Sequence, residues 1–547
     1  METVTVILVL VLAVVISGSV ARMLPFPVPL PLVQILMGAA VAMFAEWHVT
    51  LQPNLFFLLF LPPLLFLDGW RIPKAGFFRD IGTILELALG LVIFTVVGMG
   101  FFIHWMIPAI PLAVSFALAA IVSPTDPIAV TSIASRVPIP KRMMHILEGE
   151  SLLNDASGLV CMRFAVAAAM TGSFSLLDAL GTFIWLAAGG VAIGIGVTSL
   201  IMWTKDRISA RYGEETGSQI LISLLIPFGA YLAAEHMHCS GILAAVSAGI
   251  TMSFAENSGQ ALAVTRVRRS AVWDTVQFGA NGVIFVLLGE QLPSLFLRAG
   301  DIVRESGNHD PLWLIVYVLA ISFGLAALRF IWVWASLRFT LFRAARNGSK
   351  VINPGWRVVA AMSLAGVRGA ITLAGILTLP LVMNDGTLFP ARDLAIFLAA
   401  GVILTSLIAA NLFLPFLLEG VSLPEEPHAQ ERQDRARVRA AEAAIRAIGA
   451  AQNAMAKDAD TEAMSSDVAS RIMDLYRQRI VALSEPGGET ADTFRKASEI
   501  ERELRLAGLR AERNEIFRLA RTRQLDDAEA RRLVREIDLA EARYGVS

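Results

Sequence analysis

The chain has 547 residues, of which 55% are hydrophobic and 17% are charged, and its mean hydropathy is +0.62. A soluble fold of this length could not bury so much apolar surface, so the composition predicts a membrane protein that uses lipid as its solvent. The net charge of -1 gives no indication of a nucleic-acid partner, and two cysteines, Cys161 and Cys239, exclude a disulfide framework.

Apolar runs of about 20 residues, the length that spans a bilayer, recur along the first three quarters of the chain. The first run is not preceded by Lys or Arg, which argues against a cleaved signal peptide. Residues 1–420 are therefore expected to form a transmembrane domain of about thirteen helices. The predicted spans are 3–22, 28–46, 53–71, 80–104, 111–135, 142–170, 178–203, 216–235, 241–255, 270–297, 312–342, 356–382 and 392–418.

Lys and Arg residues concentrate in alternate loops, which indicates the cytoplasmic side. One set of loops contains 18 of them and the other set contains three. We therefore expect a multi-pass protein of the plasma (inner) membrane with its N-terminus outside and its C-terminus in the cytoplasm. The larger set is Arg22, Arg71, Lys74, Arg79, Arg136, Lys141, Arg142, Lys205, Arg207, Arg211, Arg266, Arg268, Arg269, Arg338, Arg343, Arg346, Lys350 and Arg357; the smaller is Arg298, Arg304 and Arg392.

Two of the predicted helices contain helix-breaking residues near their middle. Residues 123–127, Ser-Pro-Thr-Asp-Pro, interrupt the fifth span, and residues 366–369, Gly-Val-Arg-Gly, interrupt the twelfth. With the seventh span as a connector, both breaks fall in the fifth helix of a set of six, and the two sets run in opposite directions. This predicts two inverted six-helix repeats with two discontinuous crossing helices, as in secondary transporters. The alternative is that Pro and Gly only kink packed helices.

Ionisable residues at bilayer depth are costly and usually functional. Asp68 ends an apolar run and is either interfacial or functional. Asp126 precedes Pro127 in the first break, where it is expected to cap a new half-helix. Thr125 can offer a hydroxyl and a freed carbonyl to a hard cation.

Asp155 is the strongest candidate for the ion-carrying group. It lies thirteen residues after Arg142, about 20 Å into a helix that crosses a hydrocarbon core of about 30 Å. Helical spacing places Ser151 on the same face, with Asn154 beside it. Burial disfavours the charged carboxylate, so a proton and a cation would compete for Asp155. Such competition is sufficient for exchange.

A second acidic residue of the same helix, Glu150, points in a different direction from Asp155. A carboxylate at this depth needs a cationic partner to stay ionised. Arg329, deep in the eleventh span, is the expected partner. Arg368 lies in the second break, where its guanidinium can satisfy the carbonyl ends of the crossing half-helices.

Four motifs, in this order, resemble the sodium/proton exchangers of the cation:proton antiporter 1 family. They lie at residues 61–68 (LPPLLFLD), 123–130 (SPTDPIAV), 149–155 (GESLLND) and 366–371 (GVRGAI). The resemblance implies a thirteen-helix fold, a homodimer and a sliding core that includes the crossing helices. It implies that Asp155 binds the monovalent cation or the proton, with Asn154, Ser151, Thr125 and Asp68 around the cation, and that Glu150 pairs with Arg329.

A protein of this family is expected to need no cofactor beyond the transported ions. Relatives with two adjacent Asp residues are thought to move more than one proton per cation. With Asn154 before Asp155, a single titrating carboxylate favours electroneutral one-for-one exchange, with a role in pH and sodium homeostasis. Sodium is the favoured cation, with potassium or lithium as the alternatives. A cation channel and a membrane ion sensor are competing interpretations, and an enzyme is the least favoured.

Residues 421–547 are rich in Ala, Arg, Glu and Leu, and Pro486-Gly487-Gly488 divides them. The pattern predicts amphipathic helices in a cytoplasmic C-terminal region. A regulatory or dimer-supporting role and an inert solvated extension remain equally open.

Overall fold

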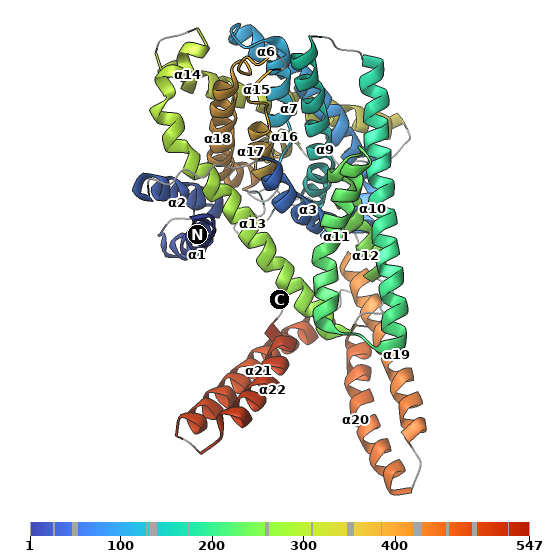
Figure 1. Cartoon of the computed structure of the whole chain (residues 1–547). Coiled ribbons are helices and arrows are strands. Elements are labelled where there is room, and N and C mark those ends of the chain that lie inside the picture. The colour runs from blue at the N-terminus through green and yellow to red at the C-terminus, as the bar shows by residue number, and fades with distance from the viewer. Residues whose placement is uncertain are drawn as a thin grey trace. The chain divides into compact units, whose positions relative to one another are not determined.

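The computed structural model of the chain (Figure 1) describes residues 2–25, 28–45, 53–126, 130, 139, 141–172, 176–256, 262–307, 310–346, 355–383, 385–419, 429–455, 459–483, 489–522 and 524–545. The chain forms two compact units, Met1–Ser422 and Leu423–Ser547. In the described residues, regular structure is helical apart from one β-bridge between Val382 and Leu388.

The helices of the first unit follow the apolar runs, because a backbone in lipid must satisfy its own hydrogen bonds. They are α1 (Glu2–Met23), α2 (Leu30–Ala45), α3 (Pro53–Arg71), α4 (Lys74–Arg79), α5 (Ile81–Leu85), the π-helix η1 (Glu86–Leu91), α6 (Val92–Met106), α7 (Leu112–Val122), α9 (Lys141–Thr171), α10 (Leu176–Tyr212), α11 (Thr216–His236), α12 (Gly241–Glu256), α13 (Ala263–Leu297), α14 (Ala299–Glu305), α15 (Leu312–Arg346), α16 (Gly355–Leu364), α17 (Ala370–Leu377) and α18 (Arg392–Leu418).

Eight helices in the described part of the chain are long and apolar enough to cross a membrane, and three shorter apolar helices accompany them. Large apolar side chains such as Phe101, Trp203 and Phe323 are exposed, whereas a soluble protein would bury them. Such a surface suits contact with lipid chains. The predicted all-α polytopic membrane fold is confirmed.

The observed helices differ from the predicted spans in several respects: α17 ends at Leu377, before the predicted end at 382, and the short helices α4 and α14 were not predicted. α10 continues to Tyr212 and α13 already begins at Ala263, because a helix can extend beyond the hydrocarbon core into the polar interface. The predicted span 80–104 is divided by the π-helix η1, which inserts a wider turn into an otherwise α-helical segment. Apolar pattern alone does not reveal these features.

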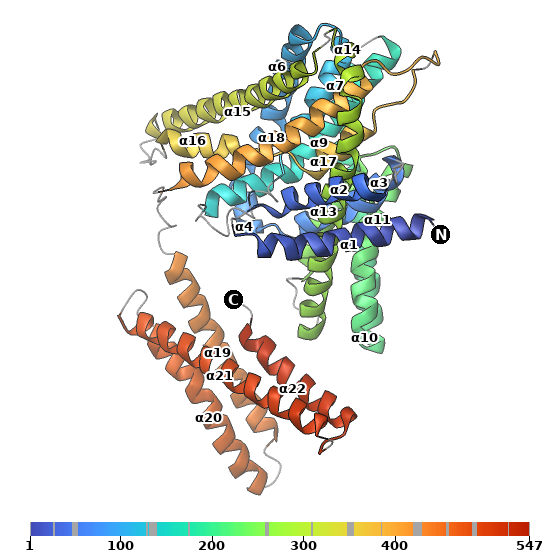
Figure 2. The ribbon, with the colours of Figure 1, turned by 90° about the vertical axis from the view of Figure 1, so that its left-hand side faces the viewer.

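The helices of the first unit pack as two bundles. The first bundle consists of α1, α2, α3, α10, α11, α12 and α13; α10, α11 and α12 run side by side in Figure 1. The crossing bundle consists of α5, η1, α6, α7, α9, α15, α16, α17 and α18; α15, α16 and α18 are seen together in Figure 2. The two bundles meet where α3, α12 and α13 contact α9, α17 and α18.

Small residues bring helices of the first bundle into close backbone contact. A Cβ atom on Gly38 of α2 would lie 1.9 Å from the carbonyl oxygen of Val286 in α13. A Cβ atom on Gly289 of α13 would lie 1.9 Å from the carbonyl oxygen of Ile35 in α2. Glycine is therefore required at both positions for the two helices to approach this closely.

Both predicted helix breaks are confirmed. α7 ends at Val122, and the described residues 123–126 that follow are not helical. α16 ends at Leu364 and α17 begins at Ala370, with non-helical residues between them. Pro127, the expected first residue of a new half-helix, lies outside the described residues.

The second unit contains two pairs of neighbouring helices. α19 (Ala429–Met455) packs on α20 (Ala459–Leu483), and α21 (Glu489–Arg521) packs on α22 (Asp527–Gly545). The amphipathic helices predicted for residues 421–547 are present. The expected division at Pro486-Gly487-Gly488 lies outside the described residues.

Candidate functional site

The two helix breaks lie against each other inside the crossing bundle. The backbone N–H of Asp126 donates a hydrogen bond of 2.7 Å to the carbonyl oxygen of Val367, so an extended segment of one broken helix pairs with that of the other. The Asp126 carboxylate lies against Gly369, where an added Cβ atom would be 1.8 Å from Oδ2. Gly369 is the residue immediately before α17.

This position refines the expectation for Asp126. Its carboxylate lies at the N-terminal end of α17, which belongs to the other broken helix. That end carries the partial positive charge of unsatisfied N–H groups, which favours a carboxylate. Asp126 therefore connects the two breaks, and Pro127, where the half-helix that it was expected to cap should begin, lies outside the described residues.

Arg368 fills the space between the breaks and is 5% exposed. Its Nε donates to the carbonyl oxygen of Val122 at 2.9 Å, and its Nη1 donates to the carbonyl oxygen of Gly366. Its backbone N–H donates to Oγ of Ser406 in α18 at 3.1 Å. The guanidinium thus supplies donors to carbonyls that the breaks leave without helical partners. The sequence placed Arg368 at the crossing but did not reveal the contribution of Ser406.

Glu150 of α9 and Arg329 of α15 form a buried ion pair, as expected. Nη1 and Nη2 of Arg329 lie 2.5 Å and 2.7 Å from the two carboxylate oxygens of Glu150. The side chains are 1% and 3% exposed. Nε of Arg329 also donates to the carbonyl oxygen of Met362 at 3.0 Å. Because the two charges form a bidentate pair, the desolvation cost of burial is offset.

A chain of hydrogen bonds extends from this ion pair toward the candidate ion site. Thr125 Oγ1 donates to Glu150 Oε1 at 3.2 Å, and Nδ2 of Asn154 donates to Thr125 Oγ1 at 3.0 Å. The ion pair therefore fixes the Thr125 hydroxyl, which in turn orients the amide of Asn154. Oδ1 of Asn154 is buried and accepts no hydrogen bond from the described residues.

Asp155 follows Asn154 on α9 and is 6% exposed. No donor in the described part of the chain hydrogen-bonds its carboxylate, whereas Glu150 on the same helix has two cationic contacts. Ser151, which is also buried, lies one turn before Asp155. A buried carboxylate without a donor is stabilised by binding either a proton or a cation.

Two further carboxylates lie near Asp155. Asp126 and Asp68 both lie close enough to Asp155 to interact with it electrostatically. Asp126 is partly exposed, and Asp68, at the end of α3, is exposed. Since α3 belongs to the first bundle and α9 to the crossing bundle, these acids line the junction between bundles. A group of neighbouring acids of this kind attracts cations.

Two further ion pairs, which the sequence did not predict, join the bundles elsewhere. Arg163 of α9 lies 3.5 Å from Glu235 of α11, and Arg298, which follows α13, lies 3.2 Å from Asp393 of α18. Each pair links a residue of the first bundle or its end to a residue of the crossing bundle. Sequence pattern gave no reason to match these partners, because their side chains are partly exposed and burial does not require them to pair.

The sequence of this chain is similar to those of known ion exchangers. The profile of a family described as "Sodium/hydrogen exchanger, transmembrane" matches residues 7–420. The chain is 39% identical over 521 residues to the "Uncharacterized Na(+)/H(+) exchanger YjcE" of Escherichia coli (strain K12), covering 93% of each protein.

A second relative is the "Sodium, potassium, lithium and rubidium/H(+) antiporter" of Bacillus subtilis (strain 168), which is 42% identical over 393 residues. That match covers 71% of this chain and 57% of the relative. The solved structure of the sodium proton antiporter MjNhaP1 from Methanocaldococcus jannaschii has a similar fold, with a TM-score of 0.55 and 20% identity. The match covers 77% of this chain and 99% of that one.

Proposed function

This chain belongs to the sodium/hydrogen exchanger family and is a cation:proton antiporter, and we propose that Asp155 is the group that carries either the cation or the proton. The observation that supports this assignment is the contrast between two buried acids on α9. Glu150 has a permanent cationic partner in Arg329, whereas the carboxylate of Asp155 accepts no hydrogen bond from the described residues. Asp155 is therefore available to exchange its ligand.

The cation site of this proposal combines Asp155 with neutral oxygen ligands. Oδ1 of Asn154 has no hydrogen-bond donor among the described residues, and its amide is oriented by Thr125. Ser151 and Thr125 supply hydroxyl oxygens, and Asp68 lies on the approach. Monovalent hard cations favour such ligands. We propose sodium as the transported cation, with potassium and lithium as the alternatives that the same ligands could serve.

The proposed stoichiometry is one cation for one proton. Asn154 is neutral and Glu150 is paired with Arg329, so Asp155 is the carboxylate of residues 149–155 that can change its ligand. Replacing a bound proton by a monovalent cation leaves the charge of the site unchanged. The transport cycle is then electroneutral, and its role is in pH and sodium homeostasis.

The proposed mechanism is alternating access, in which the crossing bundle moves against the first bundle. The acids from Asp68 to Asp155 lie at the junction of the bundles, so such a movement would expose Asp155 first to one side and then to the other. The two inter-bundle ion pairs, Arg163–Glu235 and Arg298–Asp393, would have to separate during this movement. We further propose a homodimer in the plasma membrane, with inverted repeats, an external N-terminus and a cytoplasmic C-terminal unit.

Proton flux in proteoliposomes, reported by a pH-sensitive dye, tests the proposed function. Sodium, potassium and lithium are added in turn at several pH values. We expect saturable, cation-dependent proton flux, largest with sodium. Flux that does not require a counter-ion would support a channel instead, and absence of flux with all three cations would overturn the proposed substrates.

A further inference from the structure

An exposed apolar seam runs along α21 in the second unit. We define the α21 seam as Ala497, Ile500, Leu504, Ala507 and Ala511. We propose that the α21 seam binds the same seam of a second copy of this chain, with the two α21 helices parallel. This proposal concerns the C-terminal unit and does not depend on the transport mechanism.

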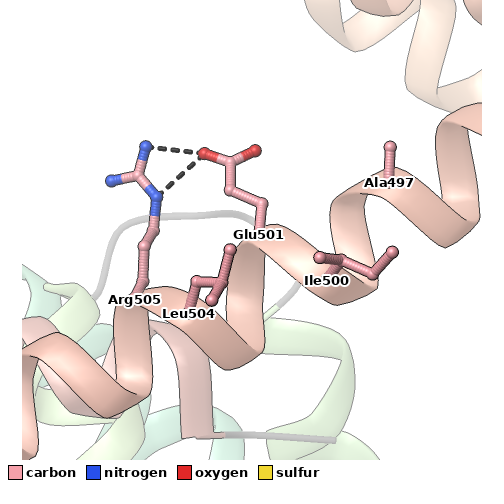
Figure 3. Close-up of a pocket in the computed structure, with 5 residues that line it drawn as sticks. All are labelled: Ala497, Ile500, Glu501, Leu504 and Arg505. Carbon is pink, nitrogen blue, oxygen red and sulfur yellow. Dashed lines mark hydrogen bonds and ion pairs between the residues drawn. The ribbon is translucent and has the colours of Figure 1, made fainter.

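The spacing of the α21 seam is that of a coiled coil. Its members follow one another at intervals of three, four, three and four residues, so they occupy the a and d positions of consecutive heptads. Ile500 and Leu504 are 60% and 68% exposed. Figure 3 shows both side chains, with Ala497, Glu501 and Arg505, lining a shallow groove along α21. Such a seam in water gains stability when a partner helix covers it.

The helix that pairs with α21 inside the unit occupies a different side. Arg513 of α21 forms an ion pair with Asp538 of α22 at 2.8 Å, and Nε of Arg502 donates to the carbonyl oxygen of Tyr544. In the heptad of the α21 seam, Arg502 and Arg513 take the outer f and c positions. α22 therefore covers the side opposite the seam.

Charges beside the α21 seam favour a second copy in parallel orientation. In a parallel pair, each g residue lies near the e residue five positions later on the partner helix. Lys496 at g would then face Glu501 of the partner, and Arg510 at g would face Glu515 of the partner. Glu503, the g residue between them, would face Gly508 and meet no charge. Both charged contacts are attractive, and each occurs twice in a symmetric pair.

The same charges disfavour an antiparallel pair that is centred on Glu503. If two antiparallel helices crossed at Glu503, this residue would face its own copy, and Lys496 would face Arg510 of the partner. All of these contacts are repulsive. The in-register parallel pair therefore brings these charges together attractively, whereas this antiparallel alignment brings them together repulsively.

The charged residues beside the α21 seam have partners within their own chain, but these partners leave them free to contact a second copy. Glu501 pairs with Arg505, and Glu515 with Arg518, within one turn of α21. Arg510 lies 3.8 Å from Glu541 of α22, and its side chain is 67% exposed. Exposed ion pairs of this type contribute little, about 0.2–1 kcal/mol, and do not hold the side chains in place.

Cysteine cross-linking of the full-length protein in membranes tests the proposal. Ala497→Cys and Ala511→Cys are made singly, and their matched controls are Glu499→Cys and Glu512→Cys, which are exposed but lie off the seam. Mild oxidation is followed by a non-reducing gel, and the parent chain with Cys161 and Cys239 sets the background. We expect disulfide-linked dimers from both seam variants at about ten times the rate of the controls, since pairing raises the effective thiol concentration.

The two seam positions also report orientation. They are fourteen residues, or about 21 Å, apart along the helix, so an antiparallel pair could cross-link at no more than one of them. Lys496→Glu should reduce cross-linking severalfold, and adding Glu501→Lys should restore it. Equal rates at seam and control positions, no dimer, or no effect of the charge changes would overturn the proposal. A seam that instead packed on α20 of its own chain would give no dimer.

Discussion

Arg329 and Glu150 meet in a two-pronged ion pair, with N–O distances of 2.5 Å and 2.7 Å, although they are 179 residues apart in the chain. The pair joins α9, which contains the candidate ion site, to α15. Through Thr125 it also orients Asn154. Glu150 therefore supports the candidate ion site at Asp155 on the same helix. The Glu150–Arg329 pair should be important for stability as well as for transport.

Removing either partner of this pair should destabilise the protein strongly. Glu150→Gln or Arg329→Met leaves an uncompensated buried charge, which costs about 3–5 kcal/mol. The double variant should lose less than the sum of the single variants, with a coupling of about 1 kcal/mol or more. The measurement is the free energy of unfolding in detergent. Asp274→Asn, in the exposed pair with Arg71, is the control and should change it by less than about 1 kcal/mol.

Asp155→Asn should abolish exchange and leave the protein folded, because the amide can neither release a proton nor neutralise a cation. Sodium-dependent proton flux in proteoliposomes is the measurement, with gel filtration to check folding. Asp206→Asn, at the polar end of α10, is the control and should retain flux. Flux that persists in the Asp155 variant would show that another group carries the proton.

Transport should be insensitive to membrane potential if Asp155 alone exchanges its ligand beside the neutral Asn154. Initial rates of sodium-dependent proton flux are compared with and without an imposed potential across the proteoliposome membrane. Equal rates are expected for one-for-one exchange. Strong stimulation by the potential would mean that net charge moves, and would rule out the proposed stoichiometry.

Gly369→Ala should disrupt the crossing of the two breaks. An added Cβ atom would lie 1.8 Å from Oδ2 of Asp126, which is far inside van der Waals contact, so either the carboxylate or α17 must shift. We expect a severalfold loss of exchange and a lower thermal midpoint. Gly196→Ala in α10 is the matched control, because a Cβ atom there has no neighbour within 4 Å among the described residues. If both variants behaved alike, close contact at the crossing would not be required.

A reducible cross-link between bundles should stop transport if the crossing bundle moves against the first. Arg163→Cys with Glu235→Cys, joined by a thiol cross-linker in a chain whose native cysteines are replaced by Ala, bridges the two bundles. Arg71→Cys with Asp274→Cys bridges α3 and α13 within the first bundle and serves as the control. Flux should disappear only with the inter-bundle link and return after reduction. Unchanged flux would exclude movement at this point.

Residue types and their spacing were sufficient to predict the membrane fold, the two helix breaks and the expected partner of Glu150. Long apolar runs form helices in lipid, and the clustered Pro and Gly residues at 123–127 and 366–369 interrupt them, so these features depend mainly on local sequence. A Pro pair alone is not sufficient, since Pro62 and Pro63 lie inside α3. The turn at η1 and the full lengths of α10 and α13 were missed, since hydropathy does not report how a helix is wound or how far it continues beyond the lipid.

The sequence by itself determined that two helices are broken near Thr125 and Arg368, and it predicted that Asp155 and Asn154 lie at membrane depth near them. Only the tertiary structure decided how they connect: Asn154 to Thr125, Thr125 to Glu150, Arg368 to Val122, and Asp126 to the start of the other broken helix. The reason is physical. The partition of a segment into lipid depends on its own composition, whereas a contact between distant segments depends on the packing of the helices that position both partners.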